Sequence, residues 1–175
     1  MELQLIRPSR RYADQVMGYK AEALAHDGRF DGCAGLEEVD SFERWMDFER
    51  RLRAKYGGEY VPSEVFLAVR CRDDKLVGIM DYRHPLSPFL LGYGGNIGYS
   101  VLPSERGKGY GCEKLRQMLH LCARYGERKV LLTCDRANEA SRRIIIRNGG
   151  VLENEVVDDV GLCDGGIIQR YWIEL

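Results

Sequence analysis

The hydrophobic positions in the first part of the chain predict one strand followed by two helices. The short apolar segment Leu3 to Arg7 favours a strand, and Pro8 ends it because proline cannot donate to a sheet ladder. Apolar residues then recur every three to four positions over 10–25, which is the spacing of one helix face. The same spacing returns after Asp40, and Gly57-Gly58 is expected to end this second helix.

Strands alternate with helices through the rest of the chain. Segments 64–70 and 76–83 are rich in β-branched and aromatic residues, and Asp73-Asp74-Lys75 between them predicts a hairpin turn. Segment 84–95 holds prolines and clustered glycines and is expected to be a loop. Hydrophobic spacing then predicts, in order, a strand at 96–101, a helix with an apolar stripe from Cys112 to Cys122, a strand at 129–134, a helix at 138–148 and strands at 151–157 and 166–174.

The predicted element order is β-α-α-β-β-β-α-β-α-β-β. This order favours an α/β (α+β) fold in which helices cover a sheet of about six or seven strands. The length of 175 residues suits one domain, and no stretch of the chain has the composition of a linker. Residues 1–175 are therefore expected to form a single domain.

Composition and charge narrow the class of protein. The 26 basic and 27 acidic side chains give a net charge of −1, which argues against a cationic nucleic-acid binder. The N-terminus lacks the apolar run of a signal peptide, and no stretch reaches the ~18 uncharged residues of a membrane helix. The six cysteines are scattered without a C-x-x-C pair, so we expect reduced thiols, a cytoplasmic protein and no metal site.

The segment from Tyr99 to Gly111 carries the clearest chemical signal. It runs from a predicted strand through a turn into a predicted helix, and Gly107, Gly109 and Gly111 alternate at that helix start. Free N–H groups and the positive dipole end make a helix start an anion site, and glycines let a ligand approach. Neither the P-loop pattern nor the dinucleotide pattern G-x-G-x-x-G fits, because Cys112 stands where the latter needs glycine. We therefore expect a pyrophosphate at this turn.

Three short motifs give the chain a family resemblance. The segment Arg106-Gly107-Lys108-Gly109-Tyr110-Gly111 resembles the R/Q-x-x-G-x-G/A signature of the GNAT N-acetyltransferase superfamily. The resemblance continues in Asn138-Glu139-Ala140-Ser141 and Asn148-Gly149-Gly150, and His84-Pro85-Leu86 resembles a bacterial subgroup of acetyltransferases. It implies the GNAT fold, with a central mixed twisted sheet, and acetyl-CoA as co-substrate without a metal.

The resemblance also implies where acetyl-CoA binds. The cofactor would lie between the strands at 96–101 and 129–134, pairing with backbone groups of the first strand. The N–H of Val101 would then stabilise the oxyanion that forms on the thioester. The residues expected to bind the cofactor are Tyr99, Ser100, Val101, Arg106, Gly107, Lys108, Gly109, Tyr110, Gly111, Cys112, Asn138 and Ser141.

The implied reaction is direct attack of an amine on the thioester, which requires a group that accepts the amine proton. Glu64, Asp81, His84 and the phenol of Tyr99 are the candidate bases, and His84 has the unperturbed pKa closest to neutral. Residues such as Asp81 and Glu64 are more often solvated carboxylates at strand edges than bases, and His84 is at least as well explained as a loop histidine.

One position departs from the family pattern. Many members carry a tyrosine acid seven residues after the asparagine that matches Asn138, and here Ile145 occupies that position. A thiol with a pKa of about 8.5 leaves tolerably as a thiolate, so water or another group would supply the proton. Cys134, Ser141 and Tyr110 are the candidate substitutes.

The acceptor is expected to be a primary amine of a small molecule or peptide, with no nucleic acid or membrane partner. Loop carboxylates would attract such a cation, although the same residues are equally well explained as solvated charges. A non-catalytic acyl-CoA-binding module and a transferase of longer acyl groups remain alternatives, and a homodimer through the final hairpin is possible. The carboxylates in question are Asp27, Asp31, Glu37, Glu38, Asp158, Asp159 and Asp164.

Overall fold

A computed structural model describes residues 2–54, 61–163 and 166–175; the predicted helix end at Gly57-Gly58 and the loop residue Asp164 lie outside them. The described strands form two sheets in which every neighbouring pair is antiparallel. The first sheet has the order β1-β2-β3-β4, and its strands are β1 (Leu3–Ile6), β2 (Ser63–Arg70), β3 (Lys75–Arg83) and β4 (Ile97–Val101). The second has the order β5-β7-β6, and its strands are β5 (Lys129–Asp135), β6 (Val151–Val157) and β7 (Ile167–Glu174).

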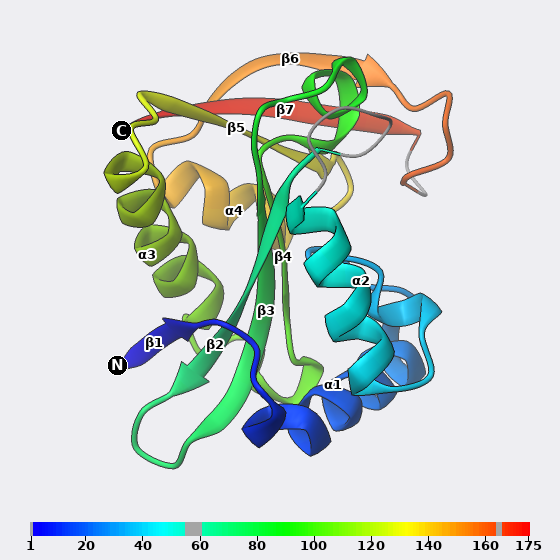
Figure 1. Cartoon of the computed structure of the whole chain (residues 1–175). Coiled ribbons are helices and arrows are strands. Elements are labelled where there is room, and N and C mark those ends of the chain that lie inside the picture. The colour runs from blue at the N-terminus through cyan, green and yellow to red at the C-terminus, as the bar shows by residue number, and fades with distance from the viewer. Residues whose placement is uncertain (1, 55–60, 164–165) are drawn as a thin grey trace.

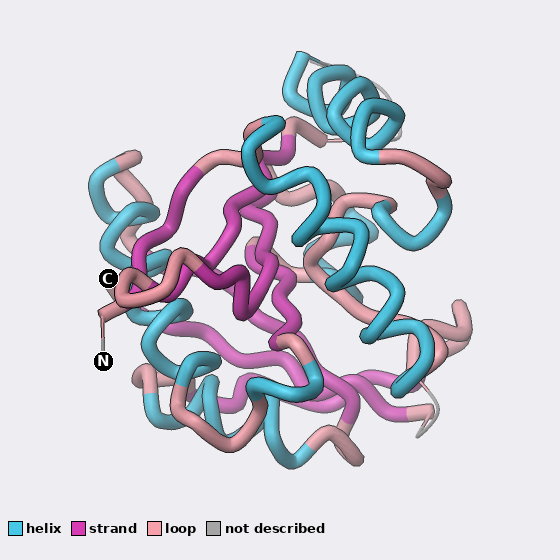
Figure 2. Tube along the Cα trace, turned by 90° about the horizontal axis from the view of Figure 1, so that it is seen from below, coloured by secondary structure: helices cyan, strands magenta, loops and turns pink. Residues whose placement is uncertain are grey.

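Helices cover both faces of the first sheet. Helices α1 (Ala13–Asp27) and α2 (Phe42–Ala54) lie on one side, and α3 (Tyr110–Arg124) and α4 (Glu139–Arg147) lie on the other (Figures 1 and 2). The second sheet lies across one end of the first (Figure 1). The predicted α/β fold class and element order are confirmed. The predicted single mixed sheet is instead divided into two antiparallel sheets, and the predicted loop 84–95 contains a helical turn at Leu90–Gly94.

The hydrophobic core has two main parts, one on each face of the first sheet. The α1–α2 face buries Val16, Tyr19, Trp45, Leu67 and Ile79, among others. The α3–α4 face buries a second group that reaches the second sheet and includes Met80, Leu115, Met118, Leu132, Ile145 and Tyr171. The alternation of side chains along β3 places Ile79 and Met80 on opposite faces, as a sheet buried on both sides requires.

Asn96, which is 4% exposed, joins the two sheets where β4 begins. Its backbone N–H donates to the carbonyl of Leu131 on β5 at 2.7 Å, and its carbonyl accepts the N–H of Arg83 at 2.8 Å. Its side chain repeats the bridge, since Nδ2 donates to the Arg83 carbonyl at 3.1 Å and Oδ1 accepts the Leu131 N–H at 2.8 Å. Gly95 permits this contact because its φ is +67° and a Cβ there would lie 2.6 Å from the Leu131 oxygen.

The two sheets separate beyond this junction. Strand β4 is the last strand of the first sheet, and β5 is an outer strand of the second. Among the described strands, β4 has β3 as its ladder partner and β5 has β7. The facing edges of β4 and β5 are therefore open to a ligand with hydrogen-bonding groups.

Candidate active site

The register of β4 directs one set of its backbone groups toward the opening between the sheets. Ser100 stands opposite Ile79 of β3. Two residues further along the chain, the N–H of Leu102 donates to the Val77 carbonyl of β3 at 3.0 Å. Because N–H directions alternate along an antiparallel strand, the N–H of Val101 points away from β3. The structure thus places this N–H at the open edge, the position that the predicted oxyanion role requires.

The turn before α3 has the backbone conformation of an anion-binding loop. Gly107 has a φ of +75° and Gly109, which caps α3, has a φ of +85°. A Cβ on Gly107 would meet no described atom within 4 Å, so this side of the turn is open. The first N–H groups of an α-helix have no partner within the helix, so α3 points donors toward the same space. Gly111 differs, because a Cβ there would lie 2.5 Å from Ile144 Cδ1 on α4; this glycine allows close helix packing.

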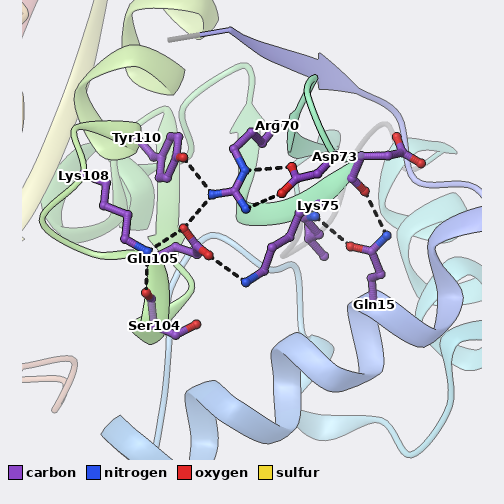
Figure 3. Close-up of polar contacts among 10 residues, drawn as sticks. Gln15, Arg70, Asp73, Lys75, Ser104, Glu105, Lys108 and Tyr110 are labelled. Atoms are coloured by element: carbon purple, nitrogen blue, oxygen red, sulfur yellow. Dashed lines mark hydrogen bonds and ion pairs between the residues drawn. The ribbon is translucent and has the colours of Figure 1, made fainter.

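The two cations of the motif are bound to carboxylates of the protein. Arg106 forms an ion pair with Asp27 of α1 through both of its terminal nitrogens, and its Nε donates to the Val101 carbonyl at 3.2 Å. Lys108 Nζ donates to Glu105 at 2.9 Å and to the Ser104 carbonyl at 2.9 Å (Figure 3). For both cations to bind a pyrophosphate, as predicted, Arg106 must release Asp27 or bind both anions at once, and Lys108 must do the same with Glu105.

Glu105 is the centre of a buried ion network behind the turn (Figure 3). Its side chain is 5% exposed and accepts hydrogen bonds from Lys75 at 2.6 Å, Lys108 at 2.9 Å and Arg70 at 2.9 Å. Lys75 and then Lys108 lower the pKa of Glu105 to about 2. The phenol of Tyr110 accepts a bond from Arg70 at 2.9 Å within this network, so its hydroxyl is committed to Arg70 and is not free for the acid role considered for it. Sequence reasoning missed Glu105.

Helix α4 brings the Asn138–Ser141 motif to the Tyr99 side chain of β4. Asn138 caps α4, with its Oδ1 accepting the N–H of Ser141 at 3.0 Å. Ser141 Oγ lies 2.8 Å from the Tyr99 hydroxyl. Burial raises the pKa of Tyr99 well above its usual value, so the phenol keeps its proton and the predicted role as a base does not fit. The side chain of Asn148 holds Cys112 in the first turn of α3 through the thiol and the carbonyl, both at 3.3 Å.

Two of the remaining candidate bases lie away from this edge. His84 Nδ1 lies 2.6 Å from Glu127, which follows the C-terminal end of α3, whereas the glycine turn precedes its N-terminal end. Glu64 pairs with Arg7 at 2.8 Å and accepts the Tyr125 hydroxyl at 3.0 Å at that same end. The structure therefore does not bring His84 or Glu64 together with the predicted cofactor residues.

Asp81 is near the opening but is committed to a neighbour. It is 3% exposed, binds Arg83 through both carboxylate oxygens at 2.9 Å, and accepts the N–H of Gly98 at 3.1 Å. A carboxylate with these three hydrogen bonds holds the start of β4 in place, which is a different role from the predicted base.

The loop between α1 and α2 crosses β4 beside this pair. Gly32, with a φ of +70°, lies so close that a Cβ there would be 2.2 Å from the backbone nitrogen of Tyr99. Asp31 therefore stands next to the open strand, and desolvation raises the pKa of its carboxyl, although Arg83 opposes this effect. Asp31 is adjacent in sequence to this contact, and Asp27 of the same predicted acidic set reaches β4 through Arg106, which donates to the Val101 carbonyl.

One candidate proton donor, Cys134, and the position of the missing family acid, Ile145, remain to be placed. The Cys134 thiol on β5 is 8% exposed, and burial raises its pKa to about 11. Ile145 is fully buried in the core beside Gly150, so the position of the family's usual acid is apolar and contributes packing. Among the described residues, no cluster of three or more His, Cys, Asp or Glu side chains could hold a metal ion.

Comparison with known proteins identifies the class to which this fold and site belong. Residues 36–151, more than half of the chain, match the family described as an acetyltransferase (GNAT) domain, and the chain belongs to this family. It is 30% identical over 101 residues to the ribosomal-protein-serine acetyltransferase of Escherichia coli (strain K12), covering 52% of this chain and 55% of that protein. The match thus spans about half the length of that relative.

Solved structures show the same fold over nearly the whole chain. The RimL ribosomal L7/L12 alpha-N-protein acetyltransferase in complex with coenzyme A superposes with a TM-score of 0.71 at 17% identity, covering 99% of this chain and 94% of that one. The microcin C7 self-immunity acetyltransferase MccE, in complex with acetyl-CoA and AMP, gives 0.71 at 14% identity, covering 99% and 93%. No described helix of the present structure is long and apolar enough to cross a membrane.

Proposed function

We propose that residues 1–175 form one N-acetyltransferase domain that transfers the acetyl group of acetyl-CoA to a primary amine of a small molecule or peptide. The observation that carries this proposal is the pair of open strand edges on β4 and β5, joined at Asn96 and closed at the far end by the glycine turn of α3. The named activities of the relatives and the coenzyme A or acetyl-CoA bound in two structural neighbours support it.

The residues of the opening fit acetyl-CoA chemically. The amide groups of its pantetheine arm would bond the free edge of β4 at Tyr99 and Val101 as an added strand does. Gly107, Gly109 and the first turn of α3 supply N–H groups for the pyrophosphate. Arg106 would exchange Asp27 for a phosphate, since both partners are anions.

The reaction assigns a role to groups on both faces of β4. The amine nitrogen forms a bond to the thioester carbon, and the carbon–sulfur bond breaks to release coenzyme A. The Val101 N–H stabilises the negative oxygen between these steps. Tyr99, which keeps its proton and is held by Ser141, donates to the leaving sulfur. Asp31, from the opposite face, binds the incoming ammonium ion and accepts its first proton. The second proton that the nitrogen loses on forming the amide returns to Tyr99, which has given its own proton to the sulfur.

An acyl-CoA-binding module without catalysis is the second candidate, because Ile145 replaces the family's usual acid. A thermal shift with acetyl-CoA tests binding, since a ligand of the folded state raises the melting temperature. Release of free thiol from acetyl-CoA across a panel of polyamines and peptide amino termini then tests catalysis. Binding without thiol release would establish the module, and no shift at millimolar acetyl-CoA would refute both candidates. Longer acyl-CoA esters in the same assay test acyl-chain preference.

We also infer that the protein is cytoplasmic, which the six free cysteines support. We further infer that it forms a homodimer. Strand β6 supports the dimer because Val151 is 70% exposed and Val157 is 68% exposed on an outer strand of the second sheet. Sedimentation velocity of the purified chain distinguishes a dimer from a monomer.

A further inference from the structure

Lys114 of α3 is a fully buried lysine that the proposed reaction does not use. It has no solvent exposure, and its Nζ donates to the backbone carbonyls of Ile79 on β3, at 3.2 Å, and of Ser100 on β4. These two residues stand opposite each other in the β3–β4 ladder. The same nitrogen lies 5.2 Å from the centre of the Tyr99 ring. Desolvation lowers the pKa of Lys114 well below its usual value, but a lysine donates N–H bonds in both protonation states.

Gly78 provides the room that the lysine needs. A Cβ on Gly78 would lie 2.9 Å from Lys114 Nζ and 3.0 Å from the Ser100 oxygen. Even a methyl group at this position would therefore press on the amine or on the carbonyl that it binds. Gly78 is also the ladder partner of Val101, so the space that holds the lysine amine lies across from the predicted oxyanion donor.

The bond from Lys114 acts on the peptide unit that contains this donor. The carbonyl of Ser100 and the N–H of Val101 belong to one planar trans peptide, in which the two groups point in opposite directions. A hydrogen bond to the carbonyl fixes the plane and makes the N–H at the other end a stronger donor, because linked hydrogen bonds polarise one another. Lys114 thus binds the carbonyl of this peptide, and the N–H of the same peptide faces the opening between the sheets.

We propose that Lys114 is a positioning residue that orients and polarises the Ser100–Val101 peptide, so that the Val101 N–H binds the thioester oxygen more strongly as it becomes negative. Lys114 lies behind the strand and acts on the reaction through the peptide. This role rests on the proposed function, since it requires acetyl-CoA at the edge of β4.

The carbonyl stretching frequency of bound acetyl-CoA tests the proposal without an identified acceptor. Acetyl-CoA labelled with carbon-13 at the thioester carbonyl gives this frequency by difference infrared spectroscopy, and a stronger hydrogen bond lowers it. We expect a lower frequency on wild-type protein than in buffer. Lys114→Met, which fills the same space without a donor, and Gly78→Ala, which displaces Nζ, should both return the frequency toward the value in buffer. The dissociation constant for acetyl-CoA should stay within about twofold.

Two further variants separate positioning from packing. Lys114→Gln keeps an N–H donor and should restore part of the shift. Cys122→Ala, a buried change on the same helix away from β4, should keep the wild-type frequency. With an amine that the panel identifies, Lys114→Met should lower kcat about tenfold at constant KM for acetyl-CoA, a smaller loss than the ~10²-fold or more of deleting an oxyanion donor.

The possible failures are distinguishable. A wild-type frequency in Lys114→Met would overturn the role of Lys114 and leave the proposed function standing. A frequency on wild-type protein equal to that in buffer would overturn the assignment of Val101 and with it the role of Lys114, while thiol release would still decide whether the protein is a transferase. If Lys114→Met fails to fold, Gly78→Ala supplies the same comparison with the lysine retained.

Discussion

The ion network around Glu105 predicts a large loss of stability in Glu105→Gln. Removing one partner of a buried ion pair costs about 3–5 kcal/mol, because it leaves uncompensated charge in the interior. The lower end applies here, since the side chains of Lys75 and Lys108 are 41% and 49% exposed and regain water, and Arg70 keeps Asp73 at 2.7 Å. We therefore expect a loss of about 3 kcal/mol, which corresponds to a melting temperature ~6–12 °C lower in a chain of this size.

Urea unfolding at pH 7 measures this loss, and Glu113→Gln is the matched control. Glu113 pairs with Arg116 three residues further along α3, and their side chains are 23% and 53% exposed. A helical surface pair of this kind contributes about 0.3–0.5 kcal/mol. If Glu105→Gln lost less than about 1 kcal/mol, the assignment of Glu105 as the centre of a stabilising network would be wrong.

The pH dependence gives an independent check on the same residue. The pKa of Glu105 is about 2 in the folded protein against an ordinary value of 4.5, so its contribution is complete above pH 4.5 and declines as the pH falls toward 2. The difference in unfolding free energy between wild type and Glu105→Gln should therefore shrink over this range. A difference that stayed constant down to pH 2.5 would contradict the lowered pKa.

Three further predictions concern the opening between the sheets. Gly107→Val should weaken acetyl-CoA binding at least ~10-fold by calorimetry, whereas Gly126→Val, also at a positive φ in open space, should cost comparable stability of about 1 kcal/mol and leave affinity unchanged. Tyr99→Phe should lower kcat roughly 10²-fold or more at unchanged acetyl-CoA affinity, and an unchanged kcat would assign the proton to another donor. Asn96→Ala should cost about 2–4 kcal/mol in urea unfolding, since it leaves the Arg83 carbonyl and the Leu131 N–H unpaired; a loss below 1 kcal/mol would show that water replaces the side chain.

Local patterns were sufficient to predict the elements of the fold. Helical spacing identified α1 to α4 and β-rich segments identified the strands, because side-chain periodicity follows directly from backbone geometry. The helical turn at Leu90–Gly94 was missed because its glycines have low helix propensity and the turn depends on tertiary contacts. The division into two sheets was also missed, since it depends on which strands pair: among the described strands, β5 pairs with β7, which is distant in sequence, and has no ladder with β4.

The candidate site was predictable where its chemistry is local. The glycine turn needs only positive φ angles and a helix start, so Gly107 and Gly109 are recognisable from their spacing. The partner of Arg106 was not predictable, because Asp27 lies 79 residues from Arg106 along the chain. The role of Lys114 was not predictable either. The helical spacing places a polar residue on the buried side of α3, but it does not reveal which carbonyls that residue binds.

The bridge at Asn96 has a consequence for how the molecule unfolds. Two hydrogen-bonded sheets that share one such residue are separate ladders, and local opening in a protein follows cooperative units of this kind. A cofactor that bonds to both β4 and β5 would link those units, so that neither ladder opens alone. Amide hydrogen exchange would then slow even in strands that the ligand does not contact. The acyl donor would therefore stabilise both sheets in addition to taking part in the reaction.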